Sequence, residues 1–115
     1  MSLKSEKIGS LFTREISRII LEEVKDPKIK FVTLTGCNVS NDLSFAKVSF
    51  LTLNRENKEE IEKTLNKAAD FIELELAKSI EIRKMPQISF HYDTSVEYGE
   101  NIEKKLKELK EKENK

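Results

Sequence analysis

Basic side chains close to predicted corners of the chain are the residues with the clearest capacity for binding chemistry. They lie at the start of the chain, around Pro27, in the middle of a long helical segment and just before Pro86. Lysine and arginine bind phosphate oxygens, and such contacts fix a protein on a nucleic-acid backbone without reading its sequence. Each residue taken alone is more often merely a surface charge. The candidate phosphate-binding residues are Lys4, Lys7, Lys25, Lys28, Lys67, Arg83 and Lys84.

The surroundings of these residues indicate how they would bind. Aromatic side chains do not interleave with them, which argues against the stacking of single-stranded bases. The chain has 21 basic and 21 acidic residues, and a net charge of zero argues against a globally basic protein. The charges are partly segregated, because residues 1–20 carry four basic and two acidic side chains. The sequence therefore favours recognition of phosphates and nucleic-acid shape through a local basic face.

Groups that could carry catalysis or hold a metal are scarce. No glycine-rich phosphate loop follows a predicted strand, and no Ser or Cys nucleophile has a recognisable partner motif. Cys37 and His91 are the single cysteine and histidine, which excludes an intramolecular disulfide and a Cys/His zinc site. The acidic run at residues 56–62 lacks the glycine of a calcium loop and is typical of a solvated helix face. We predict no enzyme activity, no catalytic residue, no metal site and no cofactor.

The length and hydropathy of the chain indicate its organisation and location. A length of 115 residues predicts one domain, at residues 1–110, followed by a frayed charged tail at residues 111–115. No run approaches the roughly 20 apolar residues that span a bilayer, and residues 1–20 lack the pattern of a signal peptide. We expect a cytoplasmic protein without membrane contact, and a monomer.

A helix and a hairpin are predicted for the first half of the chain. Apolar residues recur at three- and four-residue steps from about Ser5 to Val24, and Pro27 ends this helix. Residues 31–40 and 45–53 are rich in β-branched and aromatic residues, and Asn41-Asp42 lies between them as turn material. These two segments therefore predict an antiparallel hairpin.

A long helical segment, a third strand and a last helix are predicted for the second half. Asn57 and Glu60 have the spacing of a capping box, and an apolar stripe follows as far as Ile80. A crossover of this length suits a strand at residues 87–93 that is parallel to its neighbour. A last helix is predicted from Ser95 to Leu109, with an apolar stripe of Ile102, Leu106 and Leu109.

Together these elements predict an α+β domain with helices on one face of a small sheet. The expected core residues are Ile16, Ile20, Val48, Phe50, Leu65, Ile72 and Phe90.

Several short motifs, in their order along the chain, resemble the ribosome-binding factor A family over about Lys7 to Leu106. They are Lys25-Asp26-Pro27-Lys28, Val32-Thr33, Val39-Ser40-Asn41-Asp42-Leu43, Ala46-Lys47-Val48 and Asp93-Thr94-Ser95-Val96-Glu97. The resemblance implies a type II KH-like fold, with an α-β-β-α-α-β core, a C-terminal helix and a three-stranded sheet. It also implies binding to the small (30S) ribosomal subunit and its 16S rRNA during late maturation and rRNA processing, with a role in cold adaptation.

Ribosomal proteins are candidate partners as well. The alternative interpretation is a KH-like module that binds RNA in general or acts chiefly through ribosomal proteins. Binding to naked RNA, compared with intact subunits, separates these interpretations.

The chain departs from the family pattern between the two middle helices. Ala68, Ala69 and Asp70 occupy the place of an Ala-Xaa-Gly kink, and Glu73 stands where the family usually has Arg. Glycine costs about 1 kcal/mol relative to alanine inside a helix. A chain with Asp70 in place of glycine therefore has a weaker tendency to interrupt the helix at this position. We therefore expect the middle helices to straighten and their contact with RNA to weaken. Arginine at position 73 and glycine at position 70 are expected to tighten RNA binding.

Overall fold

The computed structural model describes residues 3–29, 31–53 and 55–95 and shows an α+β fold. Its elements are α1 (Leu3–Glu22), β1 (Val32–Val39), β2 (Phe45–Thr52), the 3-10 helix η1 (Arg55–Asn57), α2 (Lys58–Lys67), α3 (Ala69–Ser79) and β3 (Gln87–Tyr92). The predicted helix that ends at Leu109 and the tail at residues 111–115 lie outside the described residues. Within the described ranges no helix combines the length and apolarity needed to cross a membrane.

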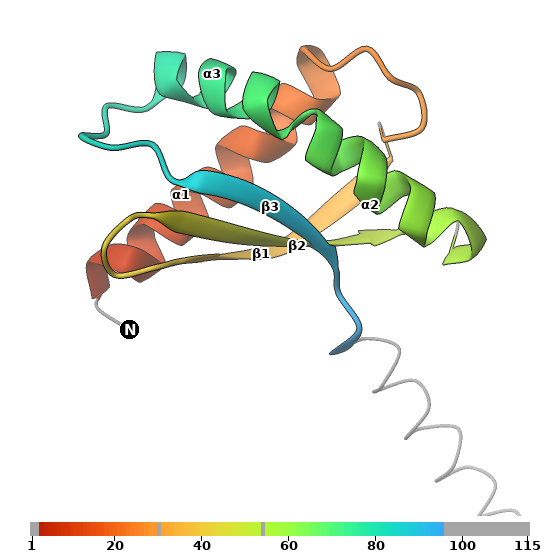
Figure 1. Cartoon of the computed structure of the whole chain (residues 1–115), viewed down its shortest axis with the longest axis horizontal. Coiled ribbons are helices and arrows are strands. Elements are labelled where there is room, and N and C mark those ends of the chain that lie inside the picture. The colour runs from red at the N-terminus through yellow and green to blue at the C-terminus, as the bar shows by residue number, and fades with distance from the viewer. Residues whose placement is uncertain (1–2, 30, 54, 96–115) are drawn as a thin grey trace, which may run out of the picture.

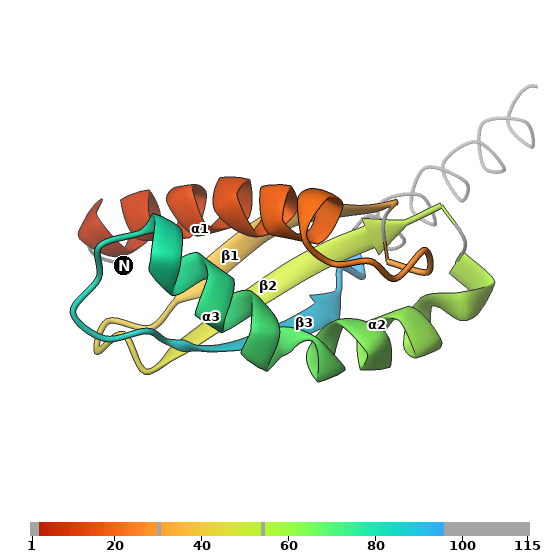
Figure 2. The ribbon, with the colours of Figure 1, turned by 90° about the horizontal axis from the view of Figure 1, so that it is seen from above.

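The three strands form one mixed sheet in the order β1-β2-β3. β1 pairs antiparallel with β2, and β2 pairs parallel with β3, so the pairing predicted from the length of the crossover is confirmed. α1, α2 and α3 all lie over the same face of this sheet (Figures 1 and 2). The described helices leave the other face uncovered, and we call it the open face.

The core lies between the helices and the sheet, where apolar residues with helical spacing meet apolar residues with strand spacing. α1 contributes a buried stripe that includes Phe12 and Ile19, and β2 buries alternate residues such as Ala46. Each of the predicted core residues is buried: Ile16, Ile20, Val48, Phe50, Leu65, Ile72 and Phe90. α1 ends at Glu22 rather than at Val24, but Val24 still packs against this core.

α1 comes so close to β1 at Gly9 that no side chain fits between them. A Cβ atom at this position would lie 2.5 Å from the backbone oxygen of Cys37, a contact that real Cβ atoms do not make. Glycine is therefore required for the close packing of α1 on the hairpin, although it lowers the helical propensity of α1.

The predicted turn between β1 and β2 is held by hydrogen bonds to side chains. Asp42 Oδ1 accepts hydrogen bonds from Ser40 Oγ at 2.8 Å and from the Ser44 backbone N–H at 3.0 Å. The bond from Ser40, followed by those from Ser44, lowers the pKa of Asp42 to about 2. Leu43 completes the turn with a φ of 61°, in the left-handed region. The turn predicted from Asn41-Asp42 is therefore confirmed, and its hydrogen bonds are satisfied locally.

The expectation that the middle helices straighten is wrong, because the structure keeps a break at Ala68 between α2 and α3 (Figure 1). The Ala68 N–H is shared between the carbonyl oxygens of Thr64 at 3.2 Å and Leu65 at 3.1 Å. Its backbone has φ −86° and ψ −2°, which alanine adopts without strain. The break therefore does not need glycine, and Asp70 lies exposed in the first turn of α3.

The predicted capping box at the start of α2 does not form. Asn57 stands at the N-cap position, but its side chain makes no capping hydrogen bond. Glu60 instead pairs with Lys28, whose Nζ lies 2.7 Å from Glu60 Oε1. α2 begins directly after the 3-10 turn η1. The pair between Glu60 and Lys28 links the first turn of α2 to the loop after α1.

Side chains from α2 and α3 hydrogen-bond the outer edge of β3. Asn66 Oδ1 accepts from the Phe90 N–H at 2.8 Å, and Asn66 Nδ2 donates to the Phe90 carbonyl oxygen at 3.0 Å. Glu73 Oε1 accepts from the Ile88 N–H at 2.6 Å. An edge strand normally presents unpaired backbone groups to solvent or to another strand. Here the two helices close that edge.

Glu73 therefore has a structural role that the sequence did not reveal. The carboxylate is directed at the backbone of β3, so the expectation that this position faces RNA is not supported by its geometry. An arginine side chain has only donors and cannot replace the carboxylate as the acceptor for the Ile88 N–H. Arginine at position 73 would open the β3 edge rather than simply restore a basic surface.

We predict that Gly9→Ala lowers the stability of the protein, although alanine is the better helix former. The added methyl group forces α1 away from Cys37, and overpacking of this kind costs about 1–3 kcal/mol. Gly36→Ala is the matched control, because a Cβ there meets nothing within 4 Å. Urea denaturation of both variants measures the difference, and equal stabilities would contradict the close approach.

We predict that Glu73→Ala and Glu73→Arg destabilise the fold, whereas Glu73→Gln is tolerated better because it keeps an acceptor. An unsatisfied buried donor costs about 1–3 kcal/mol, so the first two variants should unfold at lower urea concentration. Amide hydrogen exchange at Ile88 provides the local measurement and should accelerate in Glu73→Ala. An unchanged exchange rate there would show that the hydrogen bond to the β3 edge contributes nothing.

Candidate RNA-binding surface

The molecule has two ends that carry different charged residues. At the hairpin end lie the β1–β2 turn at residues 40–44, the start of α1 and the α3–β3 loop at residues 80–86 (Figures 1 and 2). At the opposite end lie the α1–β1 loop at residues 23–31 and the start of α2. A helix of 20 residues, the length of α1, spans about 30 Å. A single phosphate group therefore cannot contact basic residues at both ends.

The hairpin end gathers exposed basic residues from three elements. Lys7 lies on α1, and Arg83 and Lys84 lie on the α3–β3 loop; all three are exposed. Lys84 Nζ approaches Ser44 Oγ at 3.4 Å, so this loop is close to the β1–β2 turn. Within the described residues no carboxylate forms an ion pair with Lys7 or Arg83. Lys4 belongs to the first turn of α1, but its side chain lies outside the described part of the chain.

At the opposite end the basic charge is largely matched. Lys28 pairs with Glu60, and the hydrogen bond between them raises the pKa of Lys28 and lowers that of Glu60. Both side chains are exposed, so the pair adds little to stability, but it occupies the ammonium group. Lys25 is exposed beside Asp26. Among the described residues, the opposite end therefore offers fewer cations without an ion pair than the hairpin end.

Lys67 lies apart from both ends, near the break between α2 and α3. It lines a shallow hollow on α2 together with Lys63, Glu59, Glu62 and Asn66, so two lysines and two glutamates lie on the same surface. Of the kink element, Ala68 is half-buried, Ala69 is buried and Asp70 is exposed. This region therefore presents a balanced charge, and the structure does not bring the seven candidate residues onto one surface.

Two further exposed basic residues were missed by the sequence analysis. Arg14 lies seven residues after Lys7, which places both side chains along nearly the same line of α1. Its side chain is 76% exposed and its Nε lies 3.9 Å from Glu15 Oε1. Lys47 is exposed on β2, where it pairs across the sheet with Asn38 and Ser89. The seven-residue spacing and the strand alternation were the signals that could have identified them.

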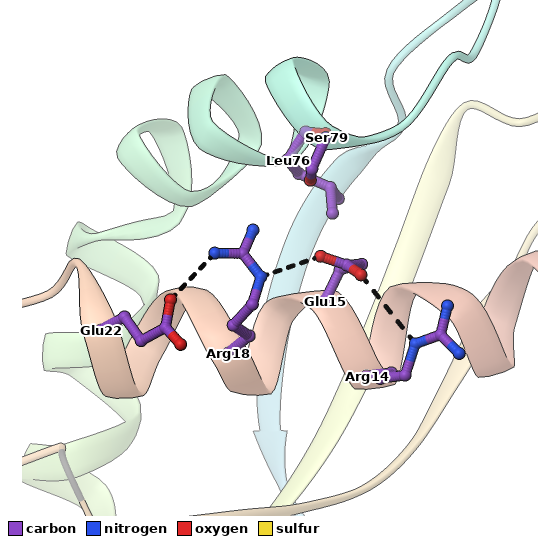
Figure 3. Close-up of polar contacts among 6 residues, drawn as sticks. All are labelled: Arg14, Glu15, Arg18, Glu22, Leu76 and Ser79. Atoms are coloured by element: carbon purple, nitrogen blue, oxygen red, sulfur yellow. Dashed lines mark hydrogen bonds and ion pairs between the residues drawn. The ribbon is translucent and has the colours of Figure 1, made fainter.

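Arg18, in contrast, is held within α1 by two acidic neighbours (Figure 3). Its Nε lies 3.0 Å from Glu15 Oε2, and its Nη1 lies 3.2 Å from Glu22 Oε2. The hydrogen bond to Glu15, followed by that to Glu22, raises the pKa of Arg18 above its usual value. Figure 3 shows these side chains on the side of α1 that faces α3. The Arg18 guanidinium is therefore engaged by two carboxylates of α1, whereas Arg14 has one longer contact with Glu15.

The remaining reactive groups do not assemble a catalytic site in the described part of the chain. Burial raises the pKa of Cys37 to about 11, which keeps it a thiol at neutral pH. His91 Nε2 lies 3.0 Å from Ser89 Oγ, and His91 Nδ1 lies 3.9 Å from Glu62 Oε1. Among the described residues, no three His, Cys, Asp or Glu side chains are grouped as metal ligands would be. The best-formed chemical feature is thus the set of exposed cations at the hairpin end.

Comparison with known proteins places the chain in one family. A model of the family described as ribosome-binding factor A matches residues 4–106. The chain is 40% identical over 109 residues to ribosome-binding factor A of Syntrophobacter fumaroxidans, an alignment that covers 92% of this chain and 93% of the relative.

Solved structures agree on the fold. The crystal structure of ribosome-binding factor A from Thermus thermophilus superposes with a TM-score of 0.69 at 20% identity, covering 76% of this chain and 93% of that one. A homology model of the Thermus protein, fitted into a cryo-EM map of a 30S complex, superposes with a TM-score of 0.61 at 20% identity and covers 75% and 91% of the two chains. The family match over most of the sequence, together with this shared fold, shows that the chain belongs to the ribosome-binding factor A family.

Proposed function

We propose that the chain binds the small ribosomal subunit and its 16S rRNA as a non-enzymatic factor of late subunit assembly. The observation that carries the proposal is membership of the ribosome-binding factor A family over nearly the whole chain. The Thermus relative has been placed in a complex with the 30S subunit, which identifies the partner proposed for this chain. The same proposal includes a role in rRNA processing and in cold adaptation. It also includes a single domain at residues 1–110, a cytoplasmic location and a monomeric state.

The hairpin end is the proposed rRNA-binding surface. It presents Lys7, Arg83 and Lys84 from separate elements, with Arg14 further along α1. Contacts from several elements can follow a folded RNA backbone, and such contacts position a protein without reading bases. Since the chain has no net charge, attraction to RNA must come from the local arrangement of charges rather than from their total.

The break between α2 and α3 is proposed to act as a structural joint rather than as a phosphate-binding loop. Ala69 is buried at the joint, Glu73 is bound to β3, and exposed Asp70 would repel phosphate. The nearby lysines Lys63 and Lys67 are balanced by two glutamates.

Binding through ribosomal proteins is the second candidate function, favoured by exposed apolar residues such as Phe71 and Leu74 on α3.

We predict that the purified chain co-sediments with small ribosomal subunits and not with large ones. The bound fraction should fall as salt is raised, because phosphate contacts release counterions at about 0.9 in log-log slope per phosphate on duplex-like nucleic acid. Comparison of immature with mature small subunits, and of both with naked rRNA, completes the measurement. Equal binding to large subunits would contradict the assignment, and indifference to salt would favour the interaction with ribosomal proteins.

We predict that Arg83→Gln and Lys84→Gln each weaken binding to the small subunit and reduce the salt slope by about 0.9 for every phosphate that the variant no longer neutralises. Lys28→Gln is the matched control, because Lys28 is already paired with Glu60 and should affect binding much less. All three residues are exposed, so circular dichroism should show an intact fold. A larger effect of Lys28→Gln than of Lys84→Gln would move the binding surface to the opposite end of the molecule.

A further inference from the structure

The open face of the sheet is built from three strands that carry no carboxylate. The whole chain has 21 acidic residues, yet β1, β2 and β3 contain neither Asp nor Glu. Lys47 is the single Lys or Arg within these strands. The helices cover the opposite face (Figures 1 and 2). A surface without carboxylates does not repel phosphates, so an RNA strand can approach the open face.

An exposed aromatic ring and an exposed cation are neighbours on this face. β2 buries Ala46, Val48 and Phe50 against the core, and the residues that alternate with them point to the open face. Phe45 is 61% exposed there, and Lys47, also exposed, follows two residues later. Among the described residues no carboxylate forms an ion pair with Lys47. The ring and the ammonium group therefore belong to one surface.

Neutral polar side chains surround this ring and this cation. Phe45 pairs with Gln87 of β3, and Lys47 lies between Asn38 of β1 and Ser89 of β3. Gln87 and Asn38 are exposed, and Ser89 is half-buried. Amide and hydroxyl groups both donate and accept hydrogen bonds, as the edges of unpaired bases do. The surroundings of the ring are therefore suited to a polar, anionic ligand rather than to an apolar one.

The carboxylates that flank the strands are engaged in their own turns. Asp42, before β2, accepts a hydrogen bond from the Ser44 N–H at 3.0 Å. Asp93, after β3, accepts one from the Ser95 N–H at 3.0 Å. Asp93 also follows Ser89 by four residues, or about 13 Å along a strand. The middle of the open face therefore keeps its positive character.

The open face continues directly into the hairpin end. The Gln87 N–H donates to the Ser44 carbonyl oxygen at 2.9 Å, and Lys84 Nζ lies 3.4 Å from Ser44 Oγ. Phe45 follows Ser44 in the chain. An RNA strand held by Lys84 can therefore run over the end of the sheet to Phe45 without crossing a helix.

We propose that the open face binds a single-stranded segment of RNA, with a base stacked on Phe45 and a phosphate at Lys47. Two residues apart on one strand corresponds to about 7 Å, and the flexible lysine side chain can reach the phosphate of the nucleotide whose base stacks on the ring. Sheet faces with exposed aromatic side chains bind unpaired bases in other folds. This inference rests on the proposed function, because rRNA is the RNA that the chain is proposed to bind.

Stacking gives the open face a preference that the hairpin end lacks. Phosphate contacts occur with paired and unpaired RNA alike, whereas a base inside a duplex is already stacked on its neighbours. Only an unpaired nucleotide can place its base on Phe45. The open face therefore selects single-stranded rRNA next to the phosphates that the hairpin end binds.

Binding of a short fluorescein-labelled oligouridine to the full-length chain, measured by fluorescence anisotropy, tests the stacking contact. Phe45→Ala should weaken binding about 5-fold or more, the effect of removing one stack between a base and an aromatic ring. Phe31→Ala is the matched control, because Phe31 is 78% exposed but lies at the end of the hairpin away from its turn. A blunt RNA duplex of the same length should bind both variants equally. Circular dichroism should show an intact fold.

The phosphate contact is tested by the salt dependence of the same binding. Lys47→Gln should weaken binding of the oligouridine and lower the log-log salt slope by about 0.7, the value for one phosphate on a single strand. Lys28→Gln is the control, because Lys28 is paired with Glu60 at the opposite end of the molecule. It should leave the slope unchanged.

The proposal is supported if Phe45→Ala and Lys47→Gln weaken binding of the oligouridine and the two controls do not. It is overturned if the unmodified chain does not bind the oligouridine, or if Phe45→Ala and Phe31→Ala bind it alike. It is also overturned if Phe45→Ala weakens only co-sedimentation with small subunits, since a ribosomal protein would then cover the open face.

Co-sedimentation of the unmodified chain with small subunits, measured in parallel, separates the two proposals. If the chain co-sediments and Phe45→Ala has no effect on the oligouridine, the open-face proposal fails and the proposed function stands. If the unmodified chain does not co-sediment, the proposed function itself fails.

Discussion

β3 lies parallel to β2, and its outer edge is hydrogen-bonded by side chains of α2 and α3 rather than by another strand. Asn66 replaces a neighbouring strand by donating to and accepting from Phe90, and Glu73 adds an acceptor for Ile88. Backbone groups of an edge strand otherwise invite pairing with another chain. The position of the two helices, and thus of the loop that joins α3 to β3, follows from this closure.

The hydrogen bonds that close the β3 edge also give two neighbouring features of the family pattern, the break at Ala68 and the residue at position 73, separate structural roles. The break at Ala68 survives without glycine, because its backbone stays in the right-handed region that alanine readily adopts. Glu73 contributes to the sheet, so its presence in place of arginine reflects an internal contact as well as a change of surface charge. In this chain the middle of the helical pair supports the sheet, and the exposed Lys63 and Lys67 near it are matched in number by Glu59 and Glu62.

A chain without net charge can still present local groups of unpaired cations. Arg18 and Lys28 are matched by carboxylates within reach of a hydrogen bond, whereas Lys7 and Arg83 have no such partner among the described residues. A paired cation contributes less to the potential felt by a phosphate than an unpaired one. Local pairing therefore decides which cations remain available, and Lys7 and Arg83 at the hairpin end are among those without an ion pair in the described residues. The end of the hairpin away from the β1–β2 turn has a different character, because it exposes the large apolar side chains Phe31 and Leu53.

The sequence by itself determined the order of the elements up to β3, apart from the break within the middle helical segment. It also determined the parallel return of β3 and the main core residues, because helical and strand periodicities are local properties of the chain. The ordered motifs also determined the family. Tertiary structure alone decided that Glu73 faces β3, that Glu60 pairs with Lys28 rather than capping α2, and that Gly9 lies on Cys37. Each of these contacts joins residues from different elements, and nothing in the spacing along the chain records which side chains meet. For the same reason the sequence could name basic residues but could not say that they divide between two ends about 30 Å apart.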